Sequence, residues 1–134
     1  MMIRVEIQPS VNRYVGNEVK KFIAWINSTM YFPKNVSITV TGSKFVYNTI
    51  TTEKVLGTFF GPYSNSTLLP VIKIATGEFF SSVDIYGIEK AKFELFELIS
   101  HEIVHFTQWL NDDPYDEAKT EIEASNIAEQ YSRL

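Results

Sequence analysis

A chain of 134 residues with a formal net charge of −4 and no cysteine excludes several classes of protein at once. The negative charge argues against nucleic acid or an anionic membrane as the main partner, and the missing cysteines exclude disulfides and thiolate sites. Since 45% of the residues are hydrophobic and 14% aromatic, the chain can bury a core, and its length predicts one domain over residues 1–134. The N-terminus lacks an apolar signal-peptide core and no apolar run is long enough to cross a bilayer, so we expect a cytoplasmic protein.

The first two thirds of the sequence predict a strand, a helix and then several strands. Residues 3–8 alternate between apolar and polar side chains, as a strand does, and residues 10–29 carry apolar side chains at helical spacing. Pro70 and Lys73 suggest that the last strand of the next group lies at a sheet edge. That group comprises strands at residues 36–42, 44–48, 54–61 and 70–76, with turn residues at 61–67.

The last third predicts two helices. The first covers about residues 88–110, where apolar side chains recur at helical spacing. The sequence NDDP at 111–114 ends it, and Asp113 as N-cap with Pro114 as first helical residue starts a second helix that reaches about Arg133. Strands first and helices last predict an α+β fold with a small, mostly antiparallel sheet.

The first of these helices contains the sequence HEIVH at residues 101–105. His101 and His105 lie one helical turn apart, so both imidazoles point to one place, on the side opposite the apolar stripe. They are the only histidines in the chain, and Glu102 follows the first of them. Two histidines and a glutamate in this order on a helix indicate a zinc site. The competing interpretation is a helical interaction module whose histidines are incidental.

A zinc site of this kind needs a third protein ligand and one position open for water. Bound zinc lowers the pKa of water to about 7, and Glu102 can accept the proton that the water loses. Because the chain has no further histidine and no cysteine, the third ligand must be Asp or Glu. Acids are concentrated where the second helix begins: residues 111–123 hold Asp112, Asp113, Asp116, Glu117, Glu121 and Glu123 against Lys119.

These residues resemble the zinc metallopeptidases of the gluzincin group, in particular the minigluzincins and the ImmA/IrrE-like peptidases. There HExxH on one helix is paired with a zinc-binding glutamate on the next, within a pattern close to E-x-x-A-[ND]-x-[FI]-A. The sequence EIEASNIA at residues 121–128 fits this pattern with Ser125 in place of the usual Asn or Asp, and the match makes Glu121 the third ligand. Glu117, one turn earlier on nearly the same face, is the alternative.

The resemblance implies a zincin-like fold and a zinc-dependent peptidase in which Glu102 is the general base and the substrate is a peptide or protein. It also implies that the strand at residues 71–75 is an edge strand that pairs with the substrate, and an ordinary strand of the sheet is the alternative. A zinc-binding domain of the same fold without catalysis is the alternative. Gln108 lies on nearly the histidine face, and we interpret it as a solvent-facing residue. For stabilising an oxyanion the tyrosine candidates are Tyr63, Tyr86, Tyr115 and Tyr131.

Overall fold

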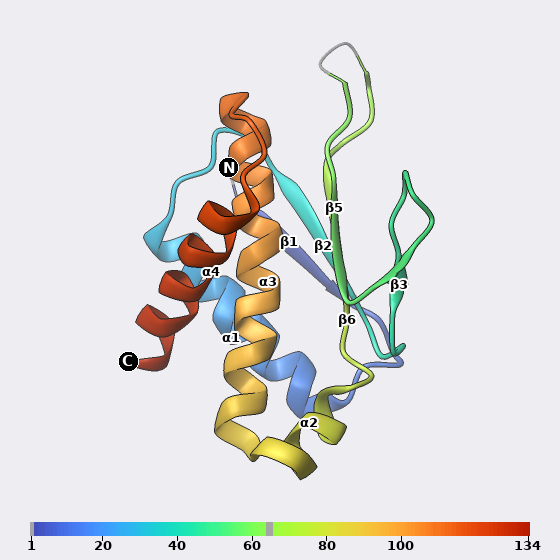
Figure 1. Ribbon diagram of the computed structural model, residues 1–134, viewed down its shortest axis with the longest axis vertical. Helices are drawn as coiled ribbons and strands as arrows, with labels where there is room; N and C mark the ends of the chain where they lie inside the picture. The colour runs from blue at the N-terminus through green and yellow to red at the C-terminus, as the bar shows by residue number, and fades with distance from the viewer. Residues whose placement is uncertain (1, 64–65) are drawn as a thin grey trace.

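The computed structural model describes residues 2–63 and 66–134, and it arranges them as a sheet with helices packed on one face (Figure 1). Four strands form the sheet in the order β1-β2-β6-β5, and β3 and β4 form a separate two-stranded ribbon. The predicted α+β class is confirmed, with a strand and a helix first and two long helices last. In chain order the elements are β1 (Ile3–Ile7), α1 (Arg13–Thr29), β2 (Val36–Thr41), β3 (Val46–Tyr47), β4 (Lys54–Val55), β5 (Gly57–Phe60), β6 (Val71–Ala75), α2 (Phe79–Tyr86), α3 (Ile88–Asn111) and α4 (Glu117–Ser132).

The sheet is mixed, whereas the sequence predicted a mostly antiparallel one. β2 runs parallel to both β1 and β6, and β5 pairs with β6 in the antiparallel sense. Helix α1 returns the chain to the end where β1 began, so β2 follows the same direction as β1. β6 lies between β2 and β5, so the prediction of an edge strand from Pro70 and Lys73 is wrong. Lys73 is tolerated there because it alternates with the buried Ile72 and Ile74 and faces away from the helices.

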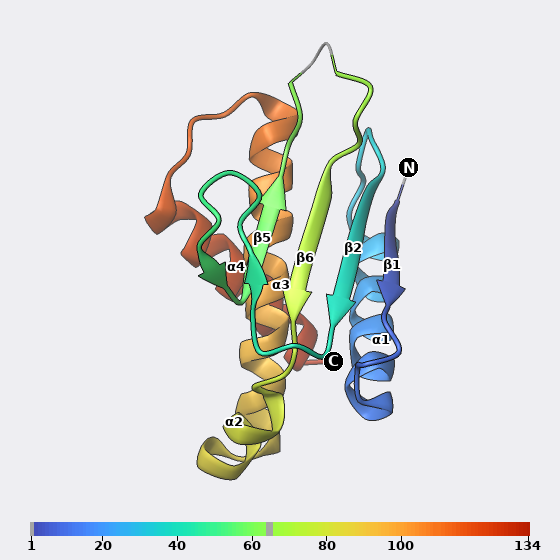
Figure 2. The same cartoon turned by 90° about the vertical axis from the view of Figure 1, so that its right-hand side faces the viewer.

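The core lies between the sheet and the helices α1 and α3, which Figure 2 shows side by side behind the strands. Buried and partly exposed residues alternate along β2, and the buried ones are Val36, Ile38 and Val40. Because side chains of a strand alternate between its two faces, these three lie on the face that is turned toward the helices. Phe22 of α1 stacks against Phe96 of α3 with ring centroids 4.8 Å apart. This contact joins α1 to α3 within the core that both helices share with the sheet.

The helix starts differ from the predicted ones because other side chains cap them. α1 begins at Arg13, with Asn12 accepting hydrogen bonds from the backbone of the first turn. α4 begins at Glu117, and its N-cap is Asp116 instead of the predicted Asp113. Helix α2 was not predicted, because its eight residues are too few for a helical repeat of apolar residues to be recognised. The turn predicted at 61–67 contains residues 64 and 65, which lie outside the described residues.

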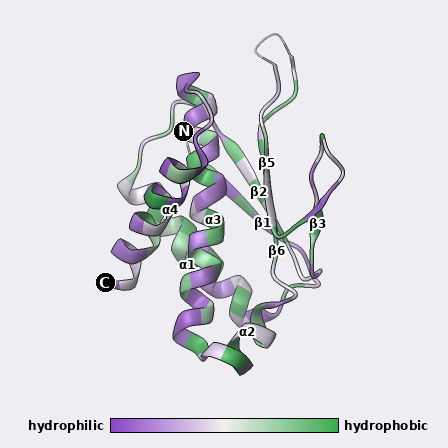
Figure 3. Cartoon of the chain, in the orientation of Figure 1, coloured by the Kyte–Doolittle hydropathy of each residue, from purple (hydrophilic) through white to green (hydrophobic). Residues whose placement is uncertain are grey.

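The two long C-terminal helices carry hydrophobic and hydrophilic residues on different faces, as the alternating colours along α3 and α4 show (Figure 3). Ile99 and Ile103 of α3 are fully buried, whereas His101 and His105 are partly exposed. The prediction that the histidines face away from the apolar stripe is therefore confirmed. Across residues 2–63 and 66–134, every helix is too short or too polar to span a bilayer.

Candidate metal centre

Helix α3 brings His101, Glu102 and His105 together, with one potential ligand atom from each within 4.8 Å of the others. The two imidazoles meet through their Nε2 atoms, which lie 3.1 Å apart, and the ring planes are nearly perpendicular at 81°. Two ligands that a tetrahedral zinc ion holds at its usual bond lengths lie about 3.3–3.4 Å apart. The separation of the two nitrogens is close to this value, so they suit a shared ion.

A carboxylate from α4 lies beside the first of these imidazoles. Oε1 of Glu117 lies 3.4 Å from Nε2 of His101, so one nitrogen faces both the second imidazole and an acid. This distance also agrees with the edge of about 3.3–3.4 Å expected for a tetrahedral site. Two imidazole nitrogens and a carboxylate oxygen are a donor set that zinc takes readily. The described residues His101, Glu102 and His105 could therefore hold a metal ion.

The two candidates for the third ligand occupy different places. Glu117, at the start of α4, makes the contact with His101. Glu121, one turn later, lines the cleft beside His101 and Glu102. Both positions follow from the packing of α4 on α3, where Ala124 is completely buried and allows the helices to approach closely. The choice of Glu121 remains a prediction, and the observed contact favours Glu117, the alternative.

Glu102 is in an unusual environment for an acid. Its side chain is only 5% exposed, and within the described part of the chain its Oε2 atom has no hydrogen-bond partner. Burial, followed by the negative charge of Glu117, raises the pKa of Glu102 to about 7. Burial also lowers the pKa of His105, which favours the neutral imidazole that binds a metal. The site thus combines two imidazole groups with a buried carboxyl group whose pKa is near neutral pH.

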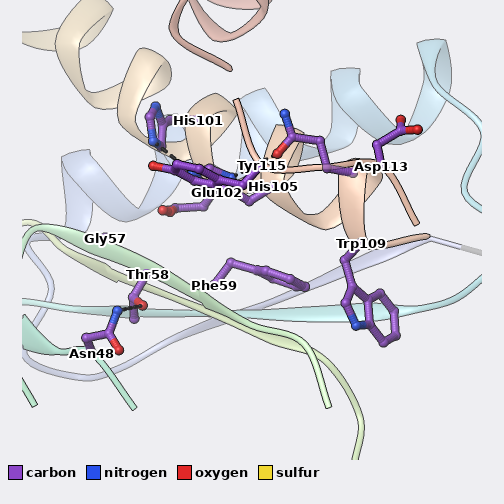
Figure 4. Close-up of a pocket in the computed structure, with 11 residues that line it drawn as sticks. Asn48, Gly57, Thr58, Phe59, His101, Glu102, His105, Trp109, Asp113 and Tyr115 are labelled. Atoms are coloured by element: carbon purple, nitrogen blue, oxygen red, sulfur yellow. Dashed lines mark hydrogen bonds between the residues drawn. The ribbon is translucent and has the colours of Figure 1, made fainter. Parts of the chain in front are cut away.

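The site lies in a cleft between α3 and the edge strand β5, shown in Figure 4. One half, a cavity of about 490 Å³, contains Phe59, Trp109 and Tyr115, and Figure 4 shows Phe59 and Trp109 on the strand side of the histidines. The other half, of about 540 Å³, meets the first at Gly57, His101 and Glu102. It contains Glu94, Glu97, Glu121 and apolar residues. Because both halves include His101 and Glu102, these residues stand at the middle of the cleft.

Two glycines of the 54–61 segment make room for this cleft. A side chain at Gly57 would come within 3.3 Å of the Glu102 Cγ atom and within 3.0 Å of Leu98. A side chain at Gly61 would come within 2.4 Å of the Trp109 ring. The sequence indicated a bulge or turn at these positions, and the structure shows that their role is close approach to α3.

The other predicted residues separate into those at the site and those away from it. Gln108, predicted to face solvent, is instead buried and bonded to His105 at 3.1 Å. Of the four tyrosines, Tyr115 is at the site, where its ring stacks on His105 with centroids 5.0 Å apart. Tyr131 packs against Phe22 in the core, and Tyr63 and Tyr86 are exposed.

Sequence reasoning did not single out Phe59 as a cleft residue. Trp109 follows His105 by one turn, and that spacing predicts its position beside the histidines, where it lies. Its indole Nε1 donates a hydrogen bond to the carbonyl of Pro62 at 3.2 Å and so ties α3 to the end of β5. The position of Phe59 depends on the pairing of β5, which no local pattern gives.

Comparisons of this chain with protein-family models, with curated proteins and with solved structures found no significant match.

Proposed function

We propose that this protein is a metal-dependent peptidase that hydrolyses peptide bonds in the cleft between β5 and α3. The observation that carries the proposal is the buried Oε2 atom of Glu102, which has no partner among the described residues and lies beside two converging imidazoles. A buried acid without a partner is unfavourable unless a bound group or substrate uses it. Such features gather at functional sites.

Three residues would hold the metal, which we propose to be zinc. His101 and His105 supply imidazole nitrogens, and α4 supplies a carboxylate, from Glu117 by the observed contact or from Glu121 by the resemblance to the gluzincins. Zinc bound in this way lowers the pKa of a water molecule and polarises a carbonyl group. This donor set contains three protein ligands, which is the number typical of catalytic sites and one fewer than in structural sites.

The carboxylate of Glu102 takes the proton of the attacking water and then transfers it to the nitrogen of the leaving amine. Its pKa of about 7 suits both steps, since the group accepts and releases a proton near neutral pH. Burial in the cleft keeps bulk water from competing for the carboxylate. Tyr115, whose ring lies on His105, is the nearest of the tyrosine candidates for stabilising the oxyanion.

The cleft suits an extended peptide chain. β5 is an edge strand of the sheet and borders the cleft along Gly57, Thr58 and Phe59. The unpaired backbone groups of an edge strand can form hydrogen bonds with a peptide laid alongside it. We therefore assign to β5 the role in substrate pairing that the resemblance suggested for residues 71–75, which lie inside the sheet.

Two measurements on one preparation test this function: zinc content by elemental analysis, and cleavage of a mixed peptide library. We expect about one zinc per chain, and we expect Glu102→Gln to retain zinc while losing activity by about 100-fold or more. Glu89→Gln serves as the control, because Glu89 is an exposed residue on the same helix. Zinc content near zero after zinc addition would exclude the metal site, and cleavage by Glu102→Gln at the parent rate would exclude the proposed base. Zinc binding without cleavage of any peptide would favour the non-catalytic alternative.

A further inference from the structure

A chain of hydrogen bonds runs from His105 through Gln108 to Thr120 on α4, and we call these three residues the Gln108 bridge. Nδ1 of His105 lies 3.1 Å from Oε1 of Gln108, and Nε2 of Gln108 lies 2.9 Å from Oγ1 of Thr120. Gln108 is 8% exposed and Thr120 is completely buried, so water competes little for these bonds. The bridge connects α3 to α4 directly behind the candidate metal centre.

The direction of each bond in the bridge follows from Thr120. Its single hydroxyl proton is donated to the backbone carbonyl of Asp116, at 2.7 Å. The hydroxyl oxygen must then accept from Gln108, which turns the amide NH₂ group toward Thr120 and the amide oxygen toward His105. An amide oxygen only accepts, so Nδ1 of His105 carries the proton and donates it.

A proton on Nδ1 determines the state of the other ring nitrogen. In the neutral imidazole only one nitrogen is protonated, so Nε2 of His105 has a free lone pair. This is the atom that lies 3.1 Å from Nε2 of His101. In water a neutral histidine side chain favours the opposite tautomer, with the proton on Nε2. The bridge therefore selects the tautomer whose lone pair points into the site.

The same bridge sets where α4 begins relative to α3. Thr120 lies one turn after Glu117, and its position is fixed by Gln108 on one side and by the Asp116 carbonyl on the other. Oε1 of Glu117 lies 3.4 Å from Nε2 of His101. One buried amide thus connects the orientation of a histidine to the placement of an acid on the neighbouring helix.

We propose that Gln108, held by Thr120, is a positioning residue that keeps His105 in its Nδ1–H tautomer and aligns α4 with the histidines. Its consequence for metal binding rests on the proposed function, whereas the tautomer does not. Partners that orient a ligating histidine typically contribute about 10- to 100-fold to metal affinity. Gln108 was interpreted from the sequence as a solvent-facing residue, and the buried bridge gives it a role in the site.

The test combines a measurement on the metal-free protein with one on zinc. Nitrogen-15 NMR of chelator-treated protein at alkaline pH reports which nitrogen of His105 is protonated, and competition with a calibrated chelator reports zinc affinity. We expect the Nδ1–H tautomer in the parent, a shift toward Nε2–H in Gln108→Leu, and an affinity loss of about 10- to 100-fold. Gln108→Glu retains an acceptor for Nδ1–H and should keep the Nδ1–H tautomer, although it loses the N–H that Gln108 donates to Thr120.

Thr120→Val provides a second test that removes one hydroxyl and leaves His105 untouched. It should shift the tautomer in the same direction as Gln108→Leu, and it carries the test if Gln108→Leu does not fold. Thr107→Val is the matched control, because the Thr107 hydroxyl also bonds a backbone carbonyl of its helix, that of Val104 at 2.8 Å.

Two results would overturn the inference: an Nε2–H tautomer in the parent protein, or an unchanged His105 tautomer in the variants that lose the bridge. A parent that binds no zinc but shows the expected tautomers would remove the proposed function and leave the positioning role of Gln108 standing.

Discussion

Glu102 couples the chemistry of the site to the stability of the protein. Its pKa rises from 4.5 to about 7 because the side chain is buried and lies near the charge of Glu117. A carboxyl group whose pKa is raised on folding binds its proton more tightly in the folded state. Its stabilising effect is complete below pH 4.5 and is lost as the pH rises through about 7.

This linkage predicts the pH dependence of a Glu102→Gln variant in the metal-free protein. Glutamine has no proton to lose, so the variant should gain stability relative to the parent by about 2–3 kcal/mol between pH 5 and pH 8. Urea unfolding of both proteins with a chelator present, at several pH values, measures the difference. Comparing the two proteins at each pH removes the contribution that other titrating groups make to the free energy of unfolding. A difference that does not change with pH would show that the burial of Glu102 leaves its pKa near the ordinary value.

Glu117 and Glu121 lead to a second prediction at the scale of single residues. They lie one helical turn apart, about 6 Å along the axis, so only one can bind the metal directly. The contact of 3.4 Å between Glu117 and His101 predicts that Glu117→Ala weakens zinc binding much more than Glu121→Ala does. Chelator competition on the two variants ranks them, and each serves as the control for the other. A larger loss of zinc affinity in Glu121→Ala would support Glu121 as the third ligand, as the resemblance to the gluzincins implies.

Spacing along the helix explains which residues of the site could be predicted from the sequence. His101, Glu102 and His105 belong to one helical turn, so helical geometry alone brings them together. The contacts made by Glu117 and Gln108 depend on the rotation and offset of α4 relative to α3. Asp112, in the left-handed conformation with φ of 53°, helps to set that offset in the connection between the helices. The sequence pattern contains no signal for this geometry, so two candidate acids remained and Gln108 was placed in solvent.

At the scale of elements, the packing of α4 on α3 decides where the acid of α4 lies. Thr120, Ala124 and Ala128 recur every four residues on one face of α4, and all three are completely buried. Small side chains at these positions let the two helices approach closely. A larger side chain there would separate the helices and move Glu117 away from His101.

An Ala124→Leu variant tests this packing. Added volume in a filled interface destabilises by about 1–3 kcal/mol, and the variant should also lose zinc affinity because α4 shifts. Ala118→Leu is the matched control, since Ala118 is exposed on the same helix and should change neither quantity. Thermal unfolding and chelator competition measure the two effects. Unchanged zinc affinity in a destabilised Ala124→Leu protein would show that the site does not depend on the spacing of the helices.

The elements themselves were largely predictable, and their pairing was not. Apolar periodicity located α1, α3 and most strands to within a few residues, because each pattern repeats within one element. The strand predicted at 54–61 is instead two strands, β4 and β5, which belong to different sheets. The order β1-β2-β6-β5 pairs strands far apart in the chain, so the inner position of β6 had no local signal. Lys73 suggested an edge, yet a lysine on the outer face of an inner strand satisfies the same pattern.

The whole molecule places the candidate metal centre between two chemically different halves of one cleft. On one side lie the aromatic residues Phe59, Trp109 and Tyr115, with Asp113 as the one acid besides Glu102. On the other lie Glu94, Glu97 and Glu121, and none of the described residues lining this half is a lysine or arginine. A peptide extended through the cleft would therefore meet aromatic surface on one side of the cleaved bond and negative charge on the other.

This division predicts the substrate preference of the proposed peptidase. Peptides with an aromatic residue on one side of the cleaved bond and Lys or Arg on the other should be cleaved about fivefold faster than peptides with Glu at the basic position. The preference should shrink as salt is added, because salt screens exposed charges. Glu94→Gln combined with Glu97→Gln should reduce it, while Glu123→Gln should not, since Glu123 on α4 pairs with Lys119. The measurement is kcat/KM for peptides that differ only in the basic or acidic residue at this position, at two salt concentrations. Equal rates for basic and acidic peptides would show that this acidic half of the cleft does not contact the substrate.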